Sequence, residues 1–295
     1  MAPTRSTYAD RAMSDSFLGQ ALATAMAVVL AGTAVVVSRS LPAGPERAGT
    51  SDGDLVVGRD VSWPNCPKGM GIASRRSQGK PMPPASARFV VIGLTNGPAF
   101  HPNPCLAAQV DYAKERHLWA AAYAVLTFPT PGQLRRYGAA GPHQHAREAG
   151  RLWNTGWAQA RQNVAAMRSV GLSSPIVWVD VEPVSPPAPW SRRVPANRAV
   201  LDGAIAAYEA AGLDIGFYST AHLWNEIVGP ARYGFPEWRT AGLSTRRAAL
   251  AMCRLNPIQG GRAVIAQWYS PHEDFNLLCP GRPAEDVLRE YFTPY

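Results

Sequence analysis

The chain has 295 residues, of which 46% are hydrophobic and 17% charged, and its formal net charge is +8. This balance indicates a folded globular protein and excludes the disordered and fibrous classes. The length suits one large domain as well as two small ones, because α/β barrels often form single domains of about 250 residues.

The first feature along the chain is an apolar segment at 17–37 that carries no charged side chain. A bilayer-spanning helix needs about 20 such residues, whereas the core of a signal peptide has about 7–15. We therefore expect a cytoplasmic stub and a membrane anchor, or else a signal segment that is cleaved; a buried core helix is the alternative. Sequence rich in Ser, Pro and Gly follows, so we assign 1–54 to stub, apolar segment and linker, and 55–295 to one folded domain.

Beyond the linker, short β-branched runs alternate with longer Ala-rich runs. Strands are expected at 56–62, 87–94, 119–127, 176–182, 214–218, 238–242, 263–268 and 275–278. Helices are expected at about 103–116, 146–170, 196–211, 221–228 and 245–253. Asn103 and Pro104 supply a cap and a first-turn proline, and Gly171 and Gly212 end two helices. Strands that alternate with helices predict a parallel sheet closed into a TIM-like (β/α) barrel.

The last two strands depart from this pattern. Only residues 269–274 separate them, whereas a helical crossover takes a dozen or more residues. The final strand is therefore expected to return as an antiparallel hairpin, which predicts an α/β barrel with an irregular C-terminal end.

Acidic residues end several of the expected strands. In parallel barrels the active site lies at the C-terminal ends of the strands. Asp60 lies near the end of the first strand, Asp180 and Glu182 end the fourth, and the hairpin brings Asp274 to the same rim. Residues i and i+2 of a strand point to one face with Cα atoms about 6.6 Å apart, so Asp180 and Glu182 both face the interior.

Paired carboxylates at this spacing suit glycoside hydrolysis. Carboxyl groups about 5–9.5 Å apart can protonate a leaving oxygen and assist the reacting sugar, and crowding of like charges raises one pKa. The Asp-x-Glu pair alone is equally consistent with acids that are solvated or bound to loop amides.

From residue 58 onward the chain resembles glycoside hydrolase family 25, the lysozymes of Chalaropsis type. The matching stretches, in order, are GRDVS (58–62), NG (96–97), DVE (180–182), GFYS (216–219), QWYS (267–270) and DFN (274–276). The resemblance implies a barrel of about five β/α units followed by three strands. It also implies cleavage of the β-1,4 bond after N-acetylmuramic acid in peptidoglycan, with Glu182 as general acid and Asp180 assisting. Asp60 and Asp274 become supporting acids.

The chain departs from the family pattern after its first strand. Trp63, Pro64, Asn65 and Cys66 are followed by an insertion at 67–84 that is rich in Gly, Arg and Pro. Related actinobacterial barrels keep this scaffold without an assigned activity. The second hypothesis is therefore a catalytically inactive barrel that binds cell-wall glycan.

Four cysteines in an exported chain favour disulfides, and four allow three pairings. In the barrel that the resemblance implies, Cys66 and Cys105 follow neighbouring strands, and Cys253 and Cys279 lie at the opposite rim. This arrangement predicts the pairs 66–105 and 253–279.

Substrate contacts are expected from Asn96 and from three aromatic side chains, Trp63, Tyr218 and Trp268, although the aromatics could equally pack in the core. We expect no metal and no cofactor, since no cysteine pair has zinc-site spacing and His143 and His145 lack neighbouring acids or cysteines.

The arginines are scattered and lack a nucleic-acid motif, so the expected partner is an anionic cell-wall polymer rather than nucleic acid; a solvated basic surface is the alternative. The protein is expected to be a monomer, extracellular or at the cell surface, anchored through 17–37 or secreted.

Overall fold

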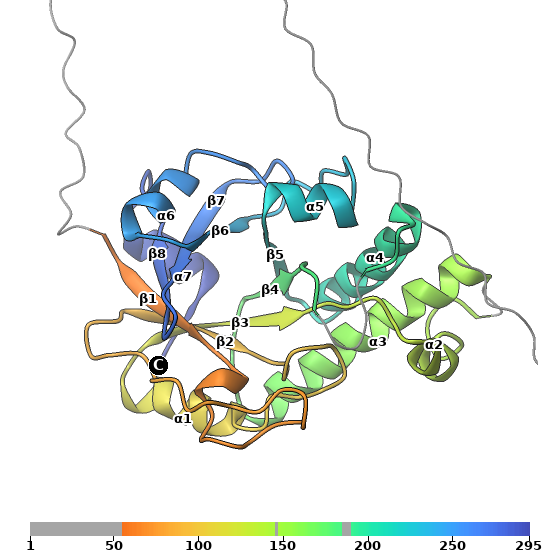
Figure 1. The fold of residues 1–295 in the computed structure, drawn as a ribbon, viewed down its shortest axis with the longest axis horizontal. Coiled ribbons are helices and arrows are strands. Elements are labelled where there is room, and N and C mark those ends of the chain that lie inside the picture. Colours follow the sequence, from red (N-terminus) through yellow and green to blue (C-terminus); the bar gives the residue numbers. More distant parts are fainter. Residues whose placement is uncertain (1–54, 145–146, 185–189) are drawn as a thin grey trace, which may run out of the picture. The chain divides into compact units, whose positions relative to one another are not determined.

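A computed structural model describes residues 55–144, 147–184 and 190–295, which belong to one compact unit, Gly49–Tyr295. Eight of its strands form a closed barrel (Figure 1). They are β1 (Val57–Val61), β2 (Phe89–Gly93), β3 (Trp119–Val125), β4 (Ile176–Asp180), β5 (Asp214–Ser219), β6 (Glu237–Leu243), β7 (Ala263–Tyr269) and β8 (Asp274–Leu278). The barrel closes because β1 pairs with both β2 and β8. The predicted α/β barrel is confirmed.

One strand of the barrel, β8, runs against the other seven. Strands β1 to β7 run parallel to their neighbours in chain order, and β8 is antiparallel to both β7 and β1. The predicted terminal hairpin is therefore confirmed, with Tyr269 opposite Asp274. A short ninth strand, β9 (Thr293–Pro294), lies antiparallel to the start of β3.

Five of the seven α-helices among the described residues were predicted from the sequence. These are α1 (Leu106–Glu115), α3 (Glu148–Ser169), α4 (Val194–Ala210), α5 (Ala221–Ile227) and α6 (Arg246–Met252). The two that were missed are α2 (Pro131–Tyr137) and α7 (Ala284–Tyr291). Helix α2 carries a capping box between Thr130 and Gln133, a start signal that the sequence does contain.

Helix α1 begins later than predicted, because Asn103 is not its cap. The N-cap is Cys105, and Asn103 instead binds the end of β2 by donating to Gly93 O at 2.8 Å. Between β1 and β2, where every residue from 62 to 88 is described, the chain forms no α-helix. It forms the 3-10 helix η1 (Trp63–Asn65) and then the insertion at 67–84.

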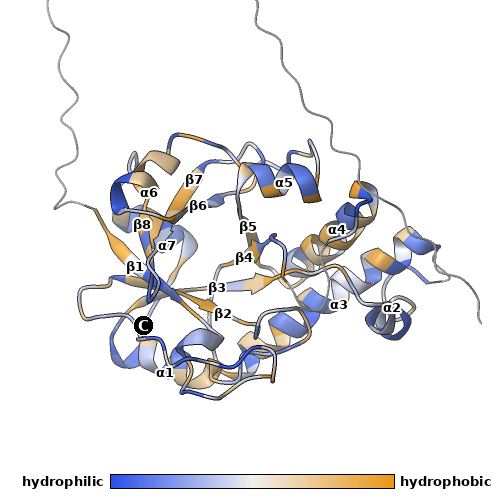
Figure 2. Ribbon diagram, in the orientation of Figure 1, coloured by the Kyte–Doolittle hydropathy of each residue, from blue (hydrophilic) through white to orange (hydrophobic). Residues whose placement is uncertain are grey.

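Strand β4 separates two apolar layers, as alternation along a buried strand requires. Val177, Val179 and Val181 point outward and pack with the surrounding helices. Ile176 and Trp178 point inward and pack with Phe89 and other side chains of the barrel interior. Figure 2 shows the corresponding concentration of hydrophobic residues on the barrel strands. The inward set includes Asp180, so this alternation aims the acid at the barrel axis.

Helix α7 closes the N-terminal end of the barrel. Its Tyr291 and the following Phe292 belong to the same apolar cluster as the inward side chains. The Phe292 ring lies 5.0 Å from that of Phe89, and the Tyr291 ring lies 6.0 Å from that of Trp178. This end of the barrel is filled, so the open end is the one where the parallel strands finish.

Helices α3 and α4 cross at two glycines. A Cβ at Gly156 would lie 1.8 Å from Val200 O, and one at Gly203 would lie 1.9 Å from Trp153 O. Only a hydrogen atom fits between these backbones, so the two glycines determine where the helices can cross.

The predicted disulfides are both present. Cys66 pairs with Cys105, and Cys253 pairs with Cys279. The expected apolar segment at 17–37 lies outside the described residues, as does the rest of 1–54. Within the described part of the chain, no helix has the length and apolar character needed to cross a membrane. The division of the chain at residue 54 stays a prediction.

Candidate active site

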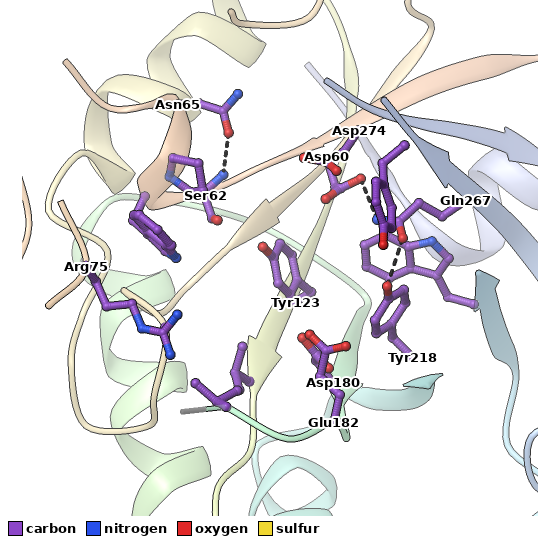
Figure 3. Close-up of a pocket in the computed structure, with 17 residues that line it drawn as sticks. Asp60, Ser62, Asn65, Arg75, Tyr123, Asp180, Glu182, Tyr218, Gln267 and Asp274 are labelled. Carbon is purple, nitrogen blue, oxygen red and sulfur yellow. Dashed lines mark hydrogen bonds between the residues drawn. The ribbon is translucent and has the colours of Figure 1, made fainter. Parts of the chain in front are cut away.

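The structure brings all four predicted acids to one cavity of about 350 Å³. Asp60 comes from β1, Asp180 ends β4, Glu182 follows it and Asp274 opens β8. Because β8 runs against the other strands, its first residue lies at the rim where they finish. Figure 3 shows Asp180 beside Glu182 and Asp60 beside Asp274.

Asp180 is the least exposed of the four acids. It is 5% exposed, and its buried Oδ1 has no hydrogen-bond partner among the residues that the structure describes. Burial raises the pKa of Asp180 well above its usual value, and the charges of Glu182 and Asp60 raise it further. A buried carboxyl oxygen without a donor costs stability, so the fold holds Asp180 at an energetic cost beside the cavity that it lines.

Glu182 lies just past the end of β4, which stops at Asp180 and not at Glu182 as predicted. Contacts with β5 nevertheless continue: Val181 N donates to Tyr218 O at 2.9 Å, and Ser219 Oγ donates to Val181 O at 2.7 Å. These bonds hold the chain extended, so Glu182 follows Asp180 onto the inward face. Burial raises the pKa of Glu182, which makes it a carboxylic acid able to give up a proton closer to neutral pH.

Asp60 is held by two side-chain amides. Asn276 Nδ2 donates to Asp60 Oδ1 at 2.6 Å, and Gln267 Nε2 donates to the same oxygen at 3.1 Å. Burial raises the pKa of Asp60 to about 7; the charge of Asp274 raises it further, and the hydrogen bonds from Gln267 and Asn276 lower it. Asp60 therefore changes charge near neutral pH.

Asp274 is paired with a cation from the insertion. Lys80 Nζ lies 3.4 Å from Asp274 Oδ2, and both side chains are about one quarter exposed. The insertion therefore reaches across the rim to the acid that opens β8. The residue spacing gave no sign of this contact, because the two residues are distant in sequence.

Several residues that line the cavity were not predicted as site residues, and Tyr123 and Gln267 are the two that lie next to the acids on inward strand positions. Tyr218 Oη donates to Gln267 Oε1 at 2.8 Å, and Gln267 in turn donates to Asp60, so a chain of hydrogen bonds links β5, β7 and β1. Burial is the main cause that raises the pKa of Tyr123 and Tyr218 well above the usual value, so both remain hydroxyl donors. Inward alternation along β3 and β7 would have identified both missed residues.

The structure separates the four predicted substrate contacts into two pairs. Trp63 and Tyr218 line the cavity, and Asn96 and Trp268 do not. Gln267 faces inward, so the next residue, Trp268, faces outward and stacks on Phe275 with ring centroids 5.1 Å apart. The structure therefore gives Trp268 a packing role.

Asn96 is 2% exposed and turned away from the cavity. With its amide oriented to satisfy both neighbours, it donates to Arg75 O and accepts from Ile72 N. In the structure this side chain holds the insertion and does not line the cavity.

A second cavity of about 680 Å³ adjoins the first. The two share Glu182, Tyr218 and Tyr269, and the second extends over α5 and the segment after β6. Glu182 thus lies between two spaces, an arrangement in which one carboxyl group can reach a bond that joins groups held on either side.

Among the residues that the structure describes, no group of three or more His, Cys, Asp or Glu side chains is arranged to hold a metal ion. His143 lies edge-on to Trp153, with ring centroids 4.5 Å apart, and His145 falls outside the described residues.

Comparison with known proteins gives one family match and several similar structures. A family profile described as Lysozyme-like protein 1 matches residues 149–238, which include Asp180 and Glu182. A search of curated proteins found no match.

Among solved structures, a muramidase from Acremonium alcalophilum is similar over 80% of this chain and 98% of its own, with 16% identity and a TM-score of 0.51. A bacterial lysozyme from Streptomyces coelicolor is similar over 81% of this chain and 98% of its own, with 16% identity and a TM-score of 0.50. The chain therefore has the fold of a lysozyme barrel like that of glycoside hydrolase family 25, as its sequence motifs predicted.

Proposed function

We propose that the protein is an exported glycoside hydrolase of muramidase type, which cleaves a β-1,4 bond in cell-wall peptidoglycan. The observation that carries the proposal is the position of Glu182. Its buried carboxyl group, with a raised pKa, lies between two adjoining cavities and next to Asp180. A polymer that crosses the rim would place one sugar in each cavity and the bond between them at Glu182.

In this mechanism Glu182 is the general acid. It donates its proton to the oxygen of the glycosidic bond as that bond breaks, which removes the need to expel an alkoxide. Burial keeps the proton on Glu182 at a pH where an exposed glutamate would have lost it. The leaving sugar would then depart through the larger cavity.

Asp180 is assigned the assisting role. It lines the cavity together with Glu182, so its carboxylate can accept a hydrogen bond from an N–H of the substrate, such as that of an acetamido group. As positive charge develops on the sugar, a carboxylate at this place stabilises it.

Asp60 and Asp274 support this pair by adding negative charge to the cavity and by positioning the sugar. The chain of hydrogen bonds from Tyr218 through Gln267 fixes Asp60, and Lys80 fixes Asp274. Trp63 and Tyr218 offer ring surfaces to the sugar in the smaller cavity.

The two disulfides suit an exported protein, because they persist in oxidising compartments. We extend the proposal to a monomer outside the cell or at its surface, secreted or anchored through residues 17–37. The membrane would then be a second partner beside the glycan.

A catalytically inactive, glycan-binding barrel is the second candidate. The ion pair between Lys80 and Asp274 favours it, because the pair engages one of the four acids. Such a protein would keep the cavity and its aromatic surfaces while lacking turnover.

Digestion of purified peptidoglycan separates the two candidates. We expect new reducing ends from the wild-type protein and a fall of about a thousandfold or more for Glu182→Gln, which keeps the shape and removes the proton donor. Glu209→Gln, a change at an exposed position on α4, is the matched control and should retain full activity. If the wild type releases no reducing ends while it still sediments with the cell wall, the binding role is correct and the hydrolase is not.

A further inference from the structure

The insertion at 67–84 places an arginine on the wall of the cavity that holds the acids. Arg75 lines this cavity together with Trp63 and Gly97. Figure 3 shows Arg75 across the cavity from Asp60 and Asp274. One wall of the cavity is therefore carboxylic and the facing wall carries a guanidinium group.

The turn that bears Arg75 is held by a buried side chain. Arg75 N donates to Ile72 O at 2.8 Å, which closes the turn. The amide of Asn96, 2% exposed, accepts from Ile72 N and donates to Arg75 O in its satisfied orientation. Both ends of the turn are thus fixed to the segment that follows β2.

Gly97 leaves the space that the arginine side chain needs. A Cβ at Gly97 would lie 2.8 Å from Arg75 Nε, and the residue has a positive φ of 73°. A side chain at position 97 would therefore displace the guanidinium as well as strain the backbone.

The rest of the insertion is fixed to the barrel in several places. The Cys66–Cys105 disulfide joins its start to the beginning of α1. Inside the insertion, Ser77 N donates to Met70 O at 2.9 Å and Gly69 N donates to Ser77 O at 3.1 Å. Arg75 is thus carried by a supported turn, which reduces the entropy lost when it binds a ligand.

A guanidinium group in this place favours one kind of sugar substituent. Carboxylates on the opposite wall disfavour a negative group there, whereas arginine binds a carboxylate through two parallel hydrogen bonds. We propose that Arg75 binds a free carboxylate on the sugar in the smaller cavity. This deepens and rests on the proposed function: the preferred substrate is a glycan whose muramic acid carries its lactyl carboxylate unblocked by peptide.

Two substrates that differ in one group test this inference. Peptide-free glycan strands carry the lactyl carboxylate, and the same strands treated with carbodiimide and ammonia carry a neutral amide in its place. The measurement is kcat/KM for release of reducing ends from each form by the wild type, Arg75→Gln, Arg75→Lys and Arg161→Gln. Arg161 is an exposed arginine on α3 and serves as the matched control.

We expect the wild type and Arg161→Gln to prefer the carboxylate form by about tenfold to a hundredfold, the usual strength of a charge-assisted bidentate contact. Arg75→Gln should reduce this ratio to about one by slowing only the carboxylate form, and Arg75→Lys should retain part of it. An equal loss on both forms, or a wild type without preference, would overturn the inference. Equal loss would mean that Arg75 only offsets the charge of the acids.

The same two strands distinguish failure of this inference from failure of the proposed hydrolase. If no variant releases reducing ends, Kd values for the two strands are measured by calorimetry with the wild type and Arg75→Gln. A carboxylate preference in binding that Arg75→Gln removes supports the inference in a protein that is not a hydrolase. The lack of such a preference, or of any binding, overturns the inference.

Discussion

Two buried acids in this barrel, Glu237 and Asp180, are held in opposite ways. At the start of β6, Glu237 is fully buried and accepts four close hydrogen bonds at 2.7–2.9 Å, from Arg239 Nε and from the backbone N–H groups of Ile258, Gln259 and Gly261. Arg239 in turn donates to three backbone carbonyl groups. At the open end of the barrel, Asp180 is nearly as buried, and one of its oxygens has no hydrogen-bond partner in the described part of the chain.

The difference distinguishes an acid that holds the fold from one that is available for chemistry. Glu237 and Arg239 fasten the loop after α6 to the sheet, and every bond that they make is internal. Asp60, Asp180 and Glu182 face a cavity, and each has a pKa raised chiefly by burial. A buried acid that lacks hydrogen-bond partners lowers the stability of the fold. Such an acid is retained where its altered pKa serves the function of the protein.

The largest expected effect on stability is at the hydrogen-bonded pair Glu237 and Arg239. Glu237→Gln replaces an acceptor that faces three backbone N–H groups with an amide and leaves the Arg239 charge buried. We expect the free energy of unfolding to fall by about 3–5 kcal/mol. Urea denaturation at pH 7 measures it, with the exposed Glu209→Gln as a control that should change by less than about 0.5 kcal/mol. A similarly small change for Glu237→Gln would remove one side of the comparison.

The next effect is the pH dependence of stability, which should come from the cavity acids. Asp60 has a pKa of about 7 in the folded protein and about 4 when unfolded, so the folded state binds more protons between these values. Stability is then fully present below about pH 4 and falls as pH rises to about 7, by about 2–4 kcal/mol. In urea titrations, Asp60→Asn should flatten the dependence of stability on pH, whereas the control Asp214→Asn, at an exposed position, should leave it unchanged. A slope unchanged in Asp60→Asn would show that other groups cause it.

Patterns along single segments predicted the fold well. Alternation placed Asp180 and Glu182 on the inward face, and the short connection between β7 and β8 predicted the hairpin that brings Asp274 to the rim. Both inferences depend only on local geometry, which a sequence records directly. Helix α7 was missed because its apolar face of Val287, Leu288 and Tyr291 lies in a short polar segment that gains its stability by closing the barrel.

The site was harder to predict wherever a side chain acts at a distance. Asn96 was expected at the substrate, yet its amide holds the turn of the insertion. Trp268 was expected at the cavity, but the register of β7 assigns that place to Gln267. The Lys80–Asp274 pair depends on how an irregular insertion lies over the barrel, and no periodicity encodes that.

A smaller effect, of opposite sign to that of Glu237→Gln, is expected at Asp180. Asp180→Asn keeps the side-chain shape and removes the group whose ionisation burial opposes. We expect the protein to be more stable by about 1–2 kcal/mol at pH 7, with the gain vanishing below about pH 3, where the carboxyl group is protonated in both the folded and the unfolded state. Reducing-end release from peptidoglycan should fall in the same variant. Lower stability at pH 7 would show that Asp180 is as well accommodated as Glu237, and the comparison would fail.

The smallest effect is expected in the hydrogen-bond chain that runs from Tyr218 through Gln267 to Asp60. Tyr218→Phe leaves Gln267 Oε1 without its donor, so the free energy of unfolding should fall by about 1 kcal/mol. Because Gln267 also donates to Asp60, a loosened amide should raise the pKa of Asp60 further and move the pH dependence of stability upward. Urea titrations across pH 4–8 measure both quantities. Tyr137→Phe, in a ring that stacks on Phe100 outside the cavity, is the control. If stability falls and its dependence on pH does not change, Tyr218 is a packing residue only. If both change, the pKa values of the cavity acids depend on neighbours that also stabilise the barrel.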